Sequence, residues 1–152
     1  MSVTVRRAAS GDLPAIEELL REGNLPLDGV APHLDGFVVA IQGDRVMGCA
    51  GLEVHGDACV LRSLAVTRAA RGHGVVRPLI GAILTEAVGR GCREAYLLTH
   101  TIEPMARRYG FTPIARDAAP ARILASGEFR LVRCQTAVLL RKDLDTTFKS
   151  RI

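Results

Sequence analysis

Runs of apolar residues in the first half of the chain predict three strands and one helix. Val3–Arg6 alternates apolar with polar residues, Phe37–Ile41 is continuously apolar, and Gly43-Asp44 forms a tight turn between this run and a partner strand over 45–54. A helix is predicted between the first two strands, with Ser10 or Asp12 as its cap. Its apolar face is formed by Leu13, Ile16, Leu19 and Leu20.

The second half of the chain alternates strand and helix patterns. Leu61–Val66 is an apolar strand, and the helix after it has apolar residues three and four apart, at Val75, Leu79, Ile80, Ile83, Leu84, Ala87 and Val88. The next strand, Glu94–Thr99, is expected to lie parallel to Leu61–Val66, because a helical crossover joins them. Four further elements are expected. The first two are a helix over Ile102–Arg108 capped by Thr101 and a strand from Phe111, with Pro113 at an exposed edge or a bulge. The last two are a helix over 118–131 broken near Gly127 and a last strand over Thr136–Leu140.

The segment between the strand Leu61–Val66 and the following helix has the properties of an anion site. Gly72 and Gly74 allow the backbone to approach a ligand closely, because they have no side chain. The start of a helix offers unpaired N–H groups and the positive end of the helix dipole. Arg68, Arg71 and Arg77 add positive charge. We therefore expect a phosphate or pyrophosphate here.

Composition narrows the class of protein. The 152 residues are 48% hydrophobic and 24% charged, which is ordinary for one globular domain, and we expect that domain to cover residues 1–144, with a polar tail over 145–152. The net charge of +4 is carried mostly by arginine and is too dispersed to indicate nucleic acid. No apolar run has the length of a membrane span, and no signal peptide is evident, so we expect a cytoplasmic protein.

The cysteines do not have the spacing of a metal site. None of the four, Cys49, Cys59, Cys92 and Cys134, belongs to a CxxC pair. We expect buried thiols in a reducing compartment and no metal.

Two motifs resemble those of the GNAT N-acetyltransferases: Leu64-Ala65-Val66 followed by Arg71-Gly72-His73-Gly74, and the helix end Arg107-Arg108-Tyr109-Gly110-Phe111. The resemblance covers essentially the whole chain. It implies a mixed α+β fold, with a mostly antiparallel twisted sheet, one parallel strand pair at the cofactor cleft, and flanking helices. It also implies acetyl transfer from acetyl-CoA to a primary amine. The pyrophosphate would lie on the loop from Arg71 to Arg77 (Arg71, Gly72, His73, Gly74, Val75, Val76, Arg77), and the pantetheine arm along Leu64, Ala65 and Val66.

Further short segments look like the GNAT branch of arsenic-resistance acetyltransferases: Leu52-Glu53, Leu61–Val66, Glu103-Pro104, Glu128-Phe129, Thr136-Ala137 and Lys142-Asp143-Leu144. The acceptor is accordingly expected to be a small, anionic amine, an amino acid or an amino-acid-like toxin. Dimers are common in the family, and the sheet edge near the last strand could pair with a second copy.

The chemistry needs a base for the ammonium group and an acid for the leaving thiolate. Glu53 is the first candidate base, because it follows an apolar strand near the centre of the fold. His100, directly after a parallel strand, is the second. Tyr109 is the candidate acid. Arg62 lies inside an apolar strand and either points to solvent or binds a substrate carboxylate, with Ser63 pointing the other way.

Other residues leave the role of the chain open. Asp28 and His33 lie in the loop on the acceptor side, where each could contact an amine or be a solvated loop residue. The family pattern has a small residue at position 76 and commonly a tyrosine at position 106, whereas this chain has Val76 and Ala106. These departures favour an alternative, a non-catalytic CoA-binding or regulatory protein. A third alternative is acetylation of protein N-termini or lysines.

Overall fold

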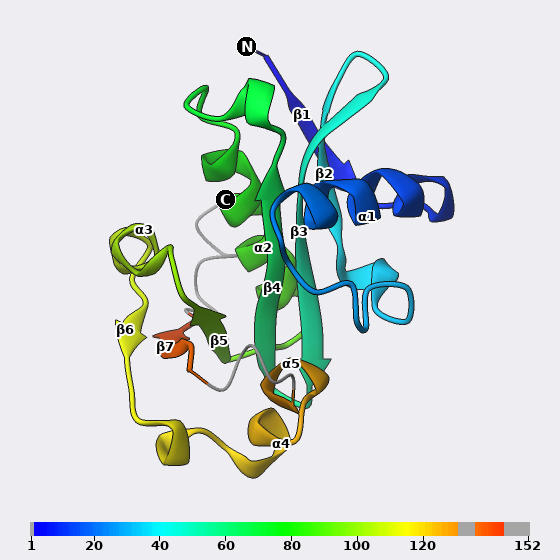
Figure 1. Ribbon diagram of the computed structural model, residues 1–152. Helices are drawn as coiled ribbons and strands as arrows, with labels where there is room; N and C mark the ends of the chain where they lie inside the picture. The colour runs from blue at the N-terminus through cyan, green and yellow to red at the C-terminus, as the bar shows by residue number, and fades with distance from the viewer. Residues whose placement is uncertain (1, 131–135, 145–152) are drawn as a thin grey trace. The chain divides into compact units, whose positions relative to one another are not determined.

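The computed structural model describes residues 2–130 and 136–144 and contains a mixed seven-stranded sheet flanked by helices (Figure 1). The hydrogen-bonding order of the strands is β1-β2-β3-β4-β5-β7-β6. The strands are β1 (Thr4–Arg7), β2 (Val38–Gln42), β3 (Arg45–His55), β4 (Ala58–Val66), β5 (Glu94–Thr99), β6 (Thr112–Pro113) and β7 (Val138–Asp143). The pair β4 and β5 is parallel, and the sheet is otherwise mostly antiparallel, so the predicted fold class is confirmed.

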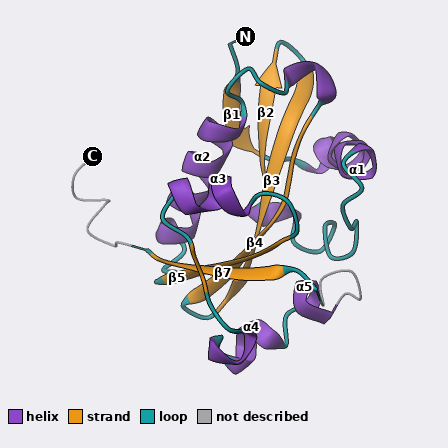
Figure 2. Cartoon of the chain, turned by 60° about the vertical axis from the view of Figure 1, so that its left-hand side comes forward, coloured by secondary structure: helices purple, strands orange, loops and turns teal. Residues whose placement is uncertain are grey.

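The helices lie where the apolar periodicity predicts them. They are α1 (Leu13–Glu22), α2 (Val76–Gly89), α3 (Glu103–Arg108), α4 (Ala121–Leu124) and α5 (Gly127–Arg130). Figure 2 shows α4 and α5 as separate short helices, which confirms the expected break. No helix among the described residues has both the length and the apolar character that crossing a bilayer requires.

The chain divides into two compact units. The N-terminal unit contains the described residues up to Glu53 together with Arg62–Glu86, and the C-terminal unit contains Val54–Leu61 and the described residues from Ala87 on. The prediction of one domain over residues 1–144 stays a prediction, and the tail over 145–152 lies outside the described residues.

The N-terminal unit has its own apolar core. Helix α1 packs its buried face against strand residues, and Asp12 at its start accepts hydrogen bonds from the Ala9 N–H at 2.7 Å and from the Arg6 guanidinium at 2.7 Å. These bonds hold β1 to the helix start. The buried residues of this core are Ile16, Leu19, Leu20, Val30, Phe37, Val39, Cys49 and Ala65.

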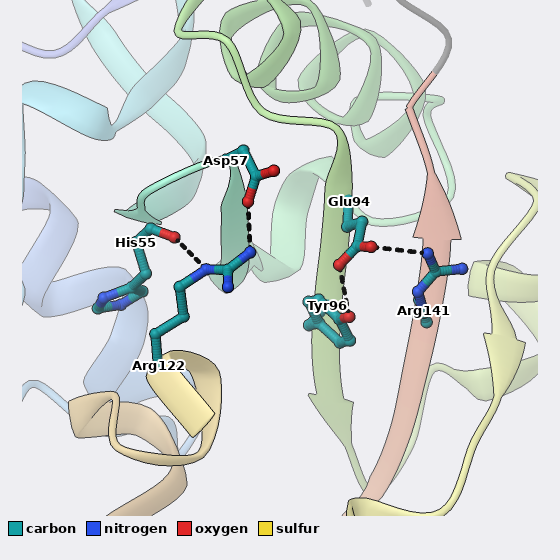
Figure 3. A network of polar contacts seen from close by, with 6 residues as sticks. All are labelled: His55, Asp57, Glu94, Tyr96, Arg122 and Arg141. Carbon is teal, nitrogen blue, oxygen red and sulfur yellow. Dashed lines mark hydrogen bonds and ion pairs between the residues drawn. The ribbon is translucent and has the colours of Figure 1, made fainter. Parts of the chain in front are cut away.

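The C-terminal unit is held by a second core and by two polar clusters that Figure 3 draws. Arg122 on α4 pairs with the Asp57 carboxylate and donates to the His55 carbonyl at 2.9 Å, so it ties the helix to the β3–β4 turn. Glu94 on β5 accepts from the Tyr96 hydroxyl at 2.8 Å and from Arg141 on β7 at 3.0 Å. Burial, followed by this bond to Glu94, raises the pKa of Tyr96.

The strand pairing differs from the prediction at the parallel pair. We expected Glu94–Thr99 to run alongside Leu61–Val66, but the ladder joins Ala58–Leu61 with Glu94–Leu97. The reason is that β4 begins at Ala58, directly after the turn at Gly56. The second half of β4 therefore extends past the end of this ladder.

The last strand does not form an edge of the sheet. β7 pairs with β5 on one side and with β6 on the other, because the chain after β6 returns between them. The edge strand at this end of the sheet is β6, beside β7, and its Pro113 lacks the N–H that a pairing strand needs. The edge near the last strand is therefore that of β6, and its pairing with a second copy stays a prediction, as does the homodimer.

Candidate active site

Glu53 on β3 and Arg62 on β4, which the sequence analysis treated separately, form a buried ion pair. Nη1 of Arg62 lies 2.7 Å from Oε2 of Glu53, and each side chain is 2% exposed. A buried pair of this kind holds together because removing either partner leaves an uncompensated charge. Arg62 does not point to solvent, and its nearest anion is a carboxylate of the same chain.

Two further donors of Arg62 bind the loop after α1 and the neighbouring serine. Its Nη2 donates to the backbone carbonyl of Asp28, and its Nε donates to Oγ of Ser63 at 2.9 Å. Asp28 thus joins the cluster through its backbone, while the residue itself is exposed. The guanidinium links β3, β4 and the loop after α1. The substrate-binding roles of Arg62 and Asp28 stay predictions.

The loop after α1 contacts the strands at two glycines. Gly29 has φ of +79°, and a Cβ atom there would come within 2.8 Å of Nη1 of Arg62. A Cβ atom on Gly36 would overlap the backbone carbonyl oxygen of Leu52. We call residues 28–36 the clamped loop, because both ends lie against the residues that flank or form the Glu53–Arg62 pair.

His33 of the clamped loop faces the same carboxylate from the other side. Its Nε2 lies 3.7 Å from Oε1 of Glu53, and its side chain is 38% exposed. The backbone of His33 is fixed by its N–H, which donates to the Val30 carbonyl at 3.2 Å, and by its carbonyl, which accepts from Gly36 at 2.9 Å. Sequence reasoning had placed His33 in the acceptor-side loop without connecting it to Glu53.

Ser63 interrupts the regular alternation of β4. Its φ is +59°, in the left-handed region that non-glycine residues rarely adopt. For this reason its Oγ meets Arg62, and the prediction that the two side chains point apart is wrong. The Cys49 thiol donates to the Ser63 carbonyl at 3.2 Å, and burial raises the pKa of Cys49 to about 12.

The glycine loop before α2 has the backbone conformation expected of an anion cradle. Gly72 and Gly74 have φ of +82° and +76°, and a Cβ atom on either would meet nothing within 4 Å. Residues 71–74 are exposed, and α2 begins at Val76, which is partly buried. Exposed arginines at 68, 71 and 77 surround this helix start. The local chemistry therefore suits a phosphate group.

The strand end that leads into this loop is partly exposed. Leu64 and Val66 are half-buried, whereas Ala65 belongs to the core. The Val66 carbonyl accepts from Nε of Arg71 at 3.3 Å, so this arginine folds back onto the strand end. A ligand arm that pairs with Val66 would have to displace this exposed contact.

His100 and Tyr109 belong to the C-terminal unit. His100 is exposed and directly follows β5, as the sequence indicates. Tyr109 is partly exposed and ends α3. Thr101 does not cap α3 as expected, because the cap residue is Ile102 and no side chain bonds to the helix start. Just before the helix, Oγ1 of Thr99 accepts from the N–H groups of Thr101 and Ile102. Both catalytic roles stay predictions.

Three cysteines, Cys49, Cys59 and Cys92, are buried free thiols, and Cys134 lies outside the described residues. The hydrogen bond between Cys59 and Cys92 raises the pKa of Cys59 and lowers that of Cys92. Within residues 2–130 and 136–144, no cluster of three or more His, Cys, Asp or Glu side chains is arranged to hold a metal ion.

Comparison with known proteins identifies a matching family, a sequence relative and similar solved structures. Residues 8–111 match the acetyltransferase (GNAT) family model. The chain is 32% identical over 131 residues to an amino-acid acetyltransferase of Mycobacterium tuberculosis, a match that covers 78% of this chain and 74% of the relative. The structure of Rv2747 from M. tuberculosis in complex with CoA is similar, with a TM-score of 0.78, 26% identity, and coverage of 93% of this chain and 99% of that one.

A larger protein shares the fold. N-acetylglutamate synthase from Neisseria gonorrhoeae, crystallised with coenzyme A and N-acetyl-glutamate, superposes with a TM-score of 0.80 at 24% identity. The match covers 95% of this chain but spans 36% of the synthase, so it supports the fold of this region alone. The family match and the mycobacterial relative together decide the assignment: the chain belongs to the acetyltransferase (GNAT) family.

Proposed function

We propose that the protein is an acetyl-CoA-dependent N-acetyltransferase that modifies the amine of a small, amino-acid-like molecule. The observation that carries the proposal is the cradle at residues 71–77, where two glycines with positive φ precede an α-helix of 14 residues. The CoA-bound relative and the amino-acid acetyltransferase of M. tuberculosis support the same donor and the same class of acceptor.

The residues of the cradle fit a CoA pyrophosphate. The N–H groups at the start of α2 are not used within the helix, and Pro78, which has no N–H, lies in the first turn, where a helix tolerates it. The space next to Gly72 and Gly74 is open on the side where a Cβ atom would project. Arg68, Arg71 and Arg77 would neutralise the phosphates. The bound donor would supply the activated acetyl group.

The acceptor is the less specific part of the proposal. An amino acid fits the family relatives, and an anionic acceptor would suit the net charge of +4 of the whole chain. Within this class, the segments resembling arsenic-resistance acetyltransferases support an amino-acid-like toxin as one member of the substrate panel. Glu53 or His100 is proposed for proton removal, Tyr109 for protonation of the leaving thiolate, and Arg62 and Asp28 for the acceptor side.

Two measurements test the proposal. Calorimetry with acetyl-CoA should show binding in the micromolar range, and Gly72→Ala should weaken it, whereas Gly91→Ala, with a similar φ of +84° outside the cradle, should not. A thiol-release assay over a panel of amino acids should then show CoA release with at least one amine. Absence of a binding signal at millimolar acetyl-CoA would contradict the whole proposal.

Val76 at the start of α2 favours one second candidate, a CoA-binding protein without efficient catalysis, since a β-branched side chain crowds the place where the family has a small residue. Tight CoA binding without turnover on any amine, including peptides with free N-termini, would select this candidate.

A further inference from the structure

The side chain of His33 connects the buried Glu53–Arg62 pair to the surface. The carboxylate of Glu53 lies close to both Arg62 and His33: Oε2 lies 2.7 Å from Nη1 of Arg62, and Oε1 lies 3.7 Å from Nε2 of His33. Of these three side chains, those of Glu53 and Arg62 are each 2% exposed, whereas that of His33 is 38% exposed. A molecule arriving from solvent therefore meets the imidazole before it meets the carboxylate.

Glu53 is poorly placed to accept and keep a proton by itself. A proton on its carboxyl group would leave the guanidinium of Arg62 without its closest anion in a buried position, which is unfavourable. The same guanidinium holds the Asp28 carbonyl, so the ion pair also fixes the clamped loop. The carboxylate is thus the anionic partner of Arg62 and orients its neighbours.

His33 has the geometry of a proton acceptor supported by a carboxylate. An imidazole with its proton on Nε2, the nitrogen that lies 3.7 Å from Oε1 of Glu53, keeps the lone pair on Nδ1 for the proton of a ligand. When that proton arrives, the imidazolium lies beside an anion. The clamped loop holds this arrangement through Gly29, which passes directly under the guanidinium, and through the backbone bonds of His33.

We propose that His33 is the catalytic base of the acetyl transfer and that Glu53 is its positioning residue. The inference rests on the proposed function and deepens it by assigning the base. It replaces Glu53 as the group that touches the acceptor, and it assigns the residues around the clamped loop to the acceptor side.

In the proposed reaction, His33 takes a proton from the acceptor before the acetyl group is transferred. An N–H bond of the acceptor ammonium breaks, and the proton moves to Nδ1 of His33 while the electron pair stays on nitrogen. The neutral amine forms a C–N bond with the acetyl carbon that acetyl-CoA supplies, and the C–S bond breaks with its electron pair on sulfur. The thiolate takes up the second proton lost by the amine, and His33 returns the first proton to water through its exposed side.

Charged residues of β3, β4 and the clamped loop lie around His33. Glu53 faces it from β3, and Arg62 on β4 lies behind that carboxylate. Asp28 and Asp35 lie on the clamped loop itself and are exposed. The matched control is Asp44→Asn, which removes an exposed acidic charge from the β2–β3 turn, outside the clamped loop.

The test compares H33A, E53Q, the double variant and D44N with the wild-type protein. We expect H33A to lower kcat/KM by about 100-fold or more, to lose the low-pH decline of the pH–rate profile, and to recover part of its rate with added imidazole. The double variant should be no slower than H33A, because Glu53 acts through His33. D44N should behave like the wild-type protein, and acetyl-CoA binding measured by calorimetry should be unchanged in H33A.

A second readout needs no substrate. The 15N NMR shifts of the neutral His33 ring should show its proton on Nε2, and E53Q should weaken that preference. Should E53Q fail to fold, H33A and its rescue by imidazole still decide the matter. An H33A variant with the wild-type rate and pH profile would overturn the role of His33 while the proposed function stands. No turnover by the wild-type protein would overturn both.

Discussion

Gly29 lies against Arg62, so that a Cβ atom at residue 29 would come within 2.8 Å of Nη1. Gly29→Ala therefore destabilises the protein in two ways: it places a Cβ atom on a left-handed backbone, and it displaces a buried guanidinium. We expect the free energy of unfolding to fall by about 2–4 kcal/mol in urea titrations. Gly91→Ala, at a φ of +84° with nothing within 4 Å, should lose about 1–2 kcal/mol, the cost of the backbone alone. Equal losses of stability in Gly29→Ala and Gly91→Ala would show that the contact with Arg62 adds no cost.

At Ser63 we expect glycine to be a more stable replacement than alanine, which is the reverse of the usual order of stability in a strand. Both Ser63→Gly and Ser63→Ala remove the Oγ that accepts from Arg62, but glycine also relieves the φ of +59°. We expect Ser63→Gly to be the more stable variant by about 1 kcal/mol. At Val138, an exposed residue of β7, alanine should be the more stable replacement. Thermal unfolding of the four variants measures both differences.

Val76→Ala should tighten binding of CoA. The change removes a branched side chain from the first residue of α2 and adds a residue of higher helix propensity. We expect the Kd from calorimetry to fall by about three- to tenfold, which corresponds to roughly 1 kcal/mol. Stability without the ligand should change little. A weaker complex would mean that the valine contributes a contact to the ligand.

Asp12 should make stability depend on pH in the acidic range. Its hydrogen bond from Arg6, and to a smaller extent that from the Ala9 N–H, lowers the pKa of Asp12 in the folded protein, although burial opposes this. Because the folded pKa lies below the unfolded value of about 3.9, the contribution is complete above that value and is lost as pH falls through the folded pKa. Urea titrations should show Asp12→Asn to be less stable than the wild-type protein at pH 7, with a difference that shrinks below about pH 4.

Asp44→Asn serves as the control for this experiment, since Asp44 is an exposed acid in the β2–β3 turn. Its stability should follow that of the wild-type protein at both pH values. A constant difference between Asp12→Asn and the wild-type protein down to pH 2 would contradict the assignment.

Cys49 should resist thiolate-directed reagents. Burial raises its pKa to about 12, so almost no thiolate is present at pH 8. We expect iodoacetamide to leave Cys49 unmodified in the folded protein and to modify it in urea, as peptide mass spectrometry would show. Rapid modification of the native protein would indicate that the region around Ser63 opens readily.

Local features of the fold could be predicted from the sequence, because each depends on a few neighbouring residues. The turn at Gly43, the helix start after Gly74 and the edge position of Pro113 follow from backbone chemistry that a single residue determines. The glycine loop before α2 was predictable for the same reason, and the binding of an anion there stays a prediction.

The contacts between residues that are distant in sequence could not be predicted, because they depend on segments that only the fold brings together. Glu53 and Arg62 each suggested a separate role, and their ion pair appears only when two strands and the clamped loop are placed. The left-handed Ser63 has no local signature, since serine rarely adopts this conformation. The insertion of β7 between β5 and β6 likewise follows from the return of the chain and not from its pattern.

The two glycine contacts of the clamped loop set a rule for engineering the protein. Gly29 and Gly36 cannot accept a side chain without moving Arg62 or the backbone at Leu52, and Val30 is buried in the core, so these three residues should stay fixed. The exposed residues between them, Ala31, Pro32 and Asp35, can be randomised without disturbing the anchors. A small combinatorial library at these three sites would diversify the protein while its frame stays intact.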